Sequence, residues 1–336
     1  MFIVENYQLA VVLCFVTMLC WGSWGNTQKL AGKTWRYELF YWDYVIGVLL
    51  LSLIMAFTLG SMGQNGRGFV ADIQQVKPEY FISALIGGAI FNLSNILLSA
   101  SVSIAGLAVA FPLGVGLALV LGVFINYFQT PKGDPFTLFT GVLLVVIAII
   151  INAIAYKKKD APSKKHNLST KGMVLAVVAG VLMSTFYRFI AATMDLNNFI
   201  QPEAGKMTPY TAMFVFALGI FLSNFIINTI VMRKPFVGLP TTYRDYFSGN
   251  FKTHMVGVLG GLIWGLGNLF SLIAAGKAGA AISYGLGQGA TMVAAFWGVF
   301  IWKEFRGSSK KVNLYLIFMF VFFILGLSLI IKSGAN

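Results

Sequence analysis

Long apolar runs, separated by short polar or glycine-rich segments, recur along the whole 336-residue chain. A helix needs about 20 apolar residues to cross a hydrocarbon core roughly 30 Å thick. The pattern therefore predicts ten membrane-spanning helices, over residues 9–25, 40–59, 80–100, 104–124, 136–156, 172–194, 210–232, 255–275, 279–301 and 312–331.

Composition supports this prediction. The chain is 58% hydrophobic and 10% charged, and its mean hydropathy is +0.80. These values are typical of an all-α integral membrane protein, so we expect a multi-pass protein of the cell inner membrane whose surroundings are lipid. The net charge of +13 lies in loops on one side rather than on a folded basic face, and we expect no nucleic-acid partner.

Loop charge predicts the orientation. The loops after spans one, five, seven and nine hold 17 Lys and Arg residues, whereas the opposite side holds 6. Basic loops stay in the cytoplasm. We therefore expect the N- and C-termini to lie outside.

An internal repeat connects the two halves of the chain. The stretch "GGAIFNLSN" (87–95) has a counterpart, "GGLIWGLGN" (260–268), displaced by 173 positions. The pattern predicts a first five-helix repeat (1–156), a basic cytoplasmic linker (157–171) and a second five-helix repeat (172–336). Because five is odd, the second repeat enters the membrane inverted, as in transporters that work by alternating access.

Four short motifs carry a family resemblance: "CWGSWGNTQK" in span one, "YWDYVIGVLL" in span two, the "GG…SN" of span three and "GVFINYF" in span four. With these motifs the chain resembles the drug/metabolite transporter (DMT) superfamily, and within it the ureide permeases, with the glucose/ribose porters as near relatives. Plant ureide permeases carry a long central loop with a nucleotide-binding-like motif. The linker here is short and has no such pattern, so the sequence does not support ATP binding.

The resemblance implies import of a small polar solute, most simply a ureide or nucleobase-like heterocycle, by a secondary active transporter. A sugar uptake transporter and a drug/metabolite exporter of the same superfamily are the alternatives. An enzyme would need clustered catalytic groups, yet both histidines, His166 and His254, lie in or at the edge of cytoplasmic loops. We expect no catalytic residue, cofactor or metal site.

Polar side chains inside the spans are candidates for binding the solute. Asn92 and Asn95 share one face of span three, and Asn268 is the repeat counterpart of Asn95. We expect Asn92 and Trp264, nearer the helix centres, to be the better contacts. Hydrogen bonding between helices is the alternative for the asparagines.

Aromatic rings near these amides suit a planar, carbonyl-rich solute, although they also suit sugar rings. Trp21, Trp24, Tyr284 and Gln288 complete this set, with a membrane-interface belt as the alternative for the two tryptophans. Arg188, inside span six, either contacts the solute or pairs with a structural partner such as Asp195.

Asp43 is the carboxylate expected to reach a partly desolvated position, at the cytoplasmic start of span two. We assign it the coupling role, with H⁺ as the ion, while Na⁺ coupling, a proton site elsewhere such as Glu38, and facilitated diffusion without an ion stay open. An interfacial acid that pairs with Lys33 or Arg36 is the structural alternative.

Overall fold

The computed structural model describes residues 1–32, 35–63, 65–160 and 169–335. Over these residues the fold is entirely helical, without strands, and a single isolated bridge joins Met194 to Met207. The helices are α1 (Tyr7–Ser23), α2 (Gly25–Ala31), α3 (Tyr37–Phe57), α4 (Phe69–Gln75), α5 (Pro78–Ala105), α6 (Leu107–Ala110), η1 (Phe111–Gly116), α7 (Leu117–Gln129), α8 (Pro135–Asp160), α9 (Thr170–Ala191), α10 (Pro209–Arg233), α11 (Tyr243–Phe247), α12 (Phe251–Ala278), α13 (Ala280–Gly287), α14 (Ala290–Phe296), η2 (Trp297–Ile301) and α15 (Lys310–Ser333).

Ten segments of the described chain are long and apolar enough to cross a membrane, which confirms the predicted number. The start of span four differs most from its predicted position. Span four begins at Phe111 rather than at residue 104, because α5 continues to Ala105. Helix α8 passes the expected boundary at 156 and ends at Asp160, and residues 161–168 of the predicted linker lie outside the described residues.

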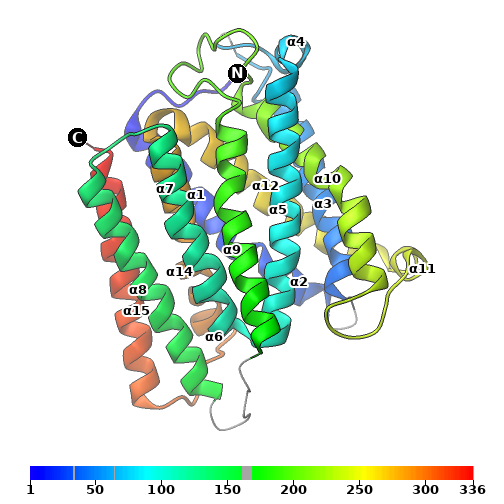
Figure 1. Ribbon diagram of the computed structural model, residues 1–336, viewed down its shortest axis with the longest axis vertical. Helices are drawn as coiled ribbons and strands as arrows, with labels where there is room; N and C mark the ends of the chain where they lie inside the picture. The colour runs from blue at the N-terminus through cyan, green and yellow to red at the C-terminus, as the bar shows by residue number, and fades with distance from the viewer. Residues whose placement is uncertain (33–34, 64, 161–168, 336) are drawn as a thin grey trace.

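The two ends of the bundle differ in what they carry (Figure 1). Both termini lie toward one end, while α8 ends and α9 begins at the other, which we call the linker end. The last turn of α5 lies there too, since Ser101 Oγ donates to the Gly172 carbonyl oxygen at 2.7 Å. Helices α8 and α15 pack on each other along one side of the bundle.

Helices α5 and α12 have matching lengths and ends. Helices α5 and α12 each have 28 residues. Each ends before a glycine of positive φ, Gly106 at 77° and Gly279 at 87°, a conformation that glycine adopts readily. The two glycines are 173 positions apart, the spacing of the repeated sequence.

Each of these two helices packs against helices that are distant from it in the sequence. Helix α5 packs against α9 and α10 of the second half, whereas α12 packs against α1 and α3 of the first. Glycines allow the close crossings: a Cβ at Gly88 would collide with the Phe216 carbonyl oxygen, and one at Gly261 with that of Tyr44. The "GG" pairs of the repeat thus serve backbone-to-backbone packing.

Three of the spans depart from regular α-helix beside one cavity. Span one changes from α1 to α2 at Trp24, span four begins with the π-helical turn η1 around Pro112, and span nine breaks at Gln288 and Gly289. Proline removes one backbone donor, and π turns occur often at functional sites. Trp24, Phe111 and Gln288, one residue from each of these three places, line the same cavity.

Candidate functional site

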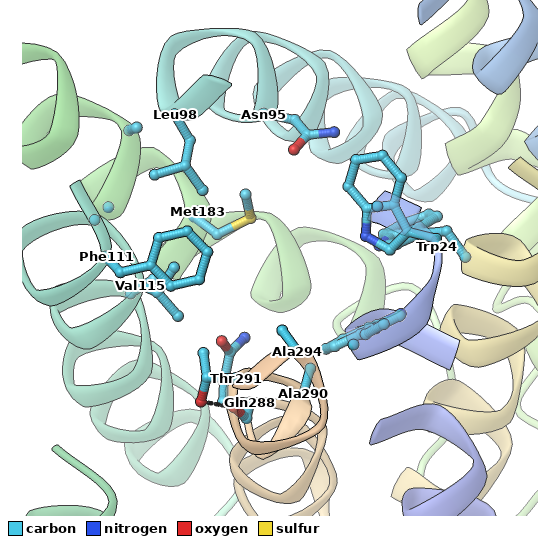
Figure 2. A pocket seen from close by; sticks show the side chains of 18 of the residues that line it. Trp24, Asn95, Leu98, Phe111, Val115, Met183, Gln288, Ala290, Thr291 and Ala294 are labelled. Carbon is cyan, nitrogen blue, oxygen red and sulfur yellow. Dashed lines mark hydrogen bonds between the residues drawn. The ribbon is translucent and has the colours of Figure 1, made fainter. Parts of the chain in front are cut away.

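A central cavity of about 240 Å³ lies between the interrupted spans (Figure 2). It is smaller than the 300–1,000 Å³ or so of typical drug sites, so its size suits a small metabolite. Its walls come from both halves of the chain: Trp21, Gly22, Trp24, Gly25, Phe91, Asn95, Leu98, Phe111, Gly114, Val115, Ala118, Ala179, Gly180, Met183, Phe186, Trp264, Gln288, Ala290, Thr291 and Ala294.

Stacked aromatic rings form one side of this cavity. Trp264 lies between Phe91, at a centroid distance of 4.4 Å, and Trp21, at 6.1 Å with an interplanar angle of 8°. Trp24 contacts Tyr44 at 4.7 Å. Phe91 and Trp264 lie at matching positions of the similar stretches 87–95 and 260–268, and together they form a flat, apolar surface that suits one face of a ring.

Two amides project into the cavity from different elements, Asn95 from α5 and Gln288 from the break in span nine (Figure 2). Asn95 is 6% exposed, and its Nδ2 donates to Tyr41 Oη at 3.4 Å. Gln288 is 8% exposed, and among the described residues its side chain has no hydrogen-bond partner. Both amides can therefore donate to and accept from a bound solute.

Two other predicted amides lie outside the walls of this cavity. Asn92 faces α10, where its Nδ2 donates to Ser223 Oγ at 2.9 Å and to the Ile220 carbonyl oxygen at 3.4 Å. Asn268 Nδ2 lies 3.1 Å from Met213 Sδ. Both asparagines are fully buried in contacts between helices. This placement matches the alternative given for them from the sequence, hydrogen bonding between helices.

Tyr284 and Arg188 also lie away from the cavity walls. The Tyr284 hydroxyl reaches the carbonyl oxygens of Ala118 at 3.2 Å and Met183 at 3.3 Å, behind the wall. Arg188 is exposed, and within the described part of the chain it forms no ion pair. Its expected partner Asp195 instead accepts from the backbone amides of Asn197 and Glu203.

The central cavity continues toward the linker end. A vestibule of about 880 Å³ shares Trp24, Gly25, Asn95, Leu98 and Phe111 with it. The vestibule is also lined by residues at the linker end of the spans, among them Lys29, Arg36, Ser103 and Phe236. A solute from that side therefore meets Asn95 at the boundary of the two spaces.

Toward the other end, buried side chains close the bundle. Phe186 contacts Phe91 at a centroid distance of 5.2 Å. Beyond it, Tyr187 Oη lies 3.0 Å from Ser271 Oγ, which lies 3.0 Å from Ser283 Oγ. All of these side chains are buried, so this conformation is open toward the linker end and closed toward the termini.

Asp43 lies in a polar cluster at the linker end of α3 and is 1% exposed. Its Oδ1 lies 2.7 Å from both Tyr246 Oη and His254 Nδ1, and its Oδ2 accepts from Trp35 Nε1 at 3.3 Å. Burial, together with the hydrogen bond to Asp43, raises the pKa of the Tyr246 hydroxyl, which stays protonated and donates.

Sequence reasoning had not found these partners. Of the two expected ones, Arg36 pairs with Glu38 at 2.8 Å, and Lys33 lies outside the described residues, as does His166. The signal for His254 was weak, namely a histidine at the edge of a span on the side predicted for Asp43. Gly257, one turn later, lets α12 approach α3 here, because a Cβ there would collide with that of Asp43.

Comparison with known proteins identifies the family. The sequence model of the ureide permease family matches residues 40–171 and 163–333. The chain belongs to the ureide permease family. This membership indicates a membrane transporter rather than an enzyme.

Full-length relatives of this permease are distant. Ureide permease 1 of Arabidopsis thaliana is 24% identical over 389 residues, and ureide permease 2 over 397, each across 100% of both chains. A putative sugar uptake protein of Enterococcus faecalis is 23% identical over 327 residues, covering 95% of this permease and 97% of the relative. A solved crystal structure shares the fold, with a TM-score of 0.63 at 13% identity over 97% of this chain and 96% of the other.

Proposed function

We propose that this permease takes up a small, neutral, planar solute of the ureide or nucleobase class, and that the central cavity is its binding site. One observation carries the proposal: an aromatic surface faces two amides with free hydrogen-bonding capacity inside the membrane spans. A ring bearing carbonyl and N–H groups matches both features. Trp21, Trp24, Trp264, Asn95 and Gln288 are the proposed contacts.

Transport occurs by alternating access between two inverted five-helix repeats, in an arrangement of the DMT type. The exchanged packing of α5 and α12, and their equivalent glycine crossings, support this proposal. In the conformation described, the cavity is open toward the linker end. The opposite conformation would separate the side chains that close the other end.

The linker end faces the cytoplasm, and both termini lie outside. The distribution of basic loop residues, 17 against 6, supports this orientation. A cysteine placed at the exposed Ala335 should react with an impermeant reagent added outside, whereas one placed at the exposed Leu239 should not. The reverse labelling would contradict the orientation.

Asp43 is the proposed coupling residue, and His254 is the group with which it shares a proton. The distance of 2.7 Å between Oδ1 and Nδ1 supports this pairing. Accumulation of a neutral solute needs an ion gradient, for which we propose H⁺. Na⁺ coupling, a proton site at Glu38 and facilitated diffusion without an ion are the alternatives.

Sugar uptake is the second candidate function. The Enterococcus relative is named as a putative sugar uptake protein, and stacked aromatic rings also bind the apolar faces of sugars. Uptake of radiolabelled allantoin or uracil, compared with glucose or ribose, separates the two candidates in cells that express the protein. Saturable uptake of allantoin or uracil alone supports the proposal, uptake of sugars alone favours the second candidate, and uptake of none contradicts both.

A further inference from the structure

A side cavity of about 210 Å³ adjoins the central cavity and extends to Lys29, Tyr156 and Glu304. It shares Gly22, Gly25, Phe111, Thr291 and Ala294 with the central cavity. Its remaining wall comes from α2, α8, α14, η2 and the segment after η2. None of the roles proposed above uses this space.

Asn152 of α8 lies in the wall of the side cavity and is 9% exposed. Its Oδ1 is buried, and no described residue donates a hydrogen bond to it. A buried amide oxygen without a partner is costly in a membrane span, where polar side chains usually serve a function. The amide therefore points to a ligand that donates an N–H and accepts through a carbonyl oxygen.

Charges at the rim of the side cavity cancel. Lys29 Nζ lies 2.7 Å from Glu304 Oε1, and Tyr156 Oη donates to Glu304 Oε2 at 2.8 Å. Burial raises the pKa of Glu304, but these two hydrogen bonds, together with the positive charges of Lys29 and Lys159, lower it further than burial raises it, so the carboxylate stays ionised beside the lysine. An uncharged ligand suits a rim without net charge.

We propose that the side cavity is a second binding site for a neutral solute with amide or urea groups, recognised by Asn152. This inference rests on the proposed function, because the ligand belongs to the solute class assigned to the central cavity. The shared wall at Gly22 and Gly25 would let a solute pass between the sites on its way to or from the linker end.

Equilibrium binding of radiolabelled allantoin to the purified full-length protein in lipid nanodiscs tests this inference. We expect two bound molecules per wild-type chain, and one each for Asn152→Leu and Asn95→Leu, which replace an amide by an apolar side chain of similar size. Ala295→Val narrows the side cavity without altering Asn152, since Ala295 lines that cavity and not the central one. Ala295→Val should also bind one molecule of allantoin per chain. It replaces Asn152→Leu in the test if that variant does not fold.

The possible failures are distinguishable. A single wild-type site that persists in Asn152→Leu and Ala295→Val but is lost in Asn95→Leu would overturn the second site and leave the proposed function standing. No allantoin binding to a folded wild-type protein would overturn both the second site and the ureide class of solute.

Discussion

Replacing Asn95 and Asn92 by alanine, one at a time, gives a matched test of the binding site. The two asparagines lie three residues apart on α5, but Asn95 lines the central cavity and Asn92 bonds to α10. Asn95 Nδ2 already donates to Tyr41, so the amide has about two hydrogen-bonding groups left for a solute. Each such bond contributes about 0.5–1.5 kcal/mol.

Loss of both bonds in Asn95→Ala should therefore weaken binding by about 1–3 kcal/mol, which raises KM about 5- to 150-fold. The amount of protein in the membrane should stay near that of the wild type. In Asn92→Ala the loss is a contact between helices, worth about 0.6 kcal/mol on average in membranes, so KM should not change.

The assay is the concentration dependence of radiolabelled allantoin uptake, normalised to the amount of each variant in the membrane by immunoblot. A raised KM in Asn92→Ala together with an unchanged KM in Asn95→Ala would refute the assignment of Asn95 to the solute. Equal losses of protein and transport in both variants would make both asparagines packing residues.

Three further predictions follow from particular positions. Gly25 borders all three cavities, and a Cβ placed there would meet no atom of a neighbouring element within 4 Å among the described residues. Gly25→Leu should therefore fold but abolish uptake, whereas Gly25→Ala should retain most of it. Normal uptake by Gly25→Leu would contradict passage of the solute through these cavities. Gly261→Val should lower the amount of protein in the membrane, because overpacking typically costs about 1–3 kcal/mol or more. The control Gly265→Ala should leave that amount near normal, because the new Cβ meets mainly the movable tip of Leu51, at 3.0 Å. A normal amount of Gly261→Val would contradict the close crossing of α3 and α12. Asp43→Asn should abolish uphill accumulation of the solute yet preserve solute exchange, measured by counterflow. The control Glu38→Gln should keep accumulation. Concentrative uptake by Asp43→Asn would instead favour another coupling site or Na⁺.

The spans could be predicted from sequence because crossing a bilayer requires long apolar segments, whatever the packing of their neighbours. The cavity was predicted in part. Polar and aromatic residues stand out in apolar helices, so the sequence singled out five residues that line the cavity: Trp21, Trp24, Asn95, Trp264 and Gln288.

Sequence alone could not separate Asn95 from Asn92. Both belong to one helix face, and which of them meets a cavity depends on where α10 lies against α5. Asp43 and His254 are 211 positions apart, so their pairing arises from tertiary packing of α3 against α12. No local pattern encodes that contact.

The most direct test of the central claim is an experimental structure of the permease with bound allantoin. We expect the solute to lie against Trp264 and Trp24, with hydrogen bonds to the amides of Asn95 and Gln288. Allantoin bound elsewhere, with the central cavity empty and both amides unchanged, would contradict it.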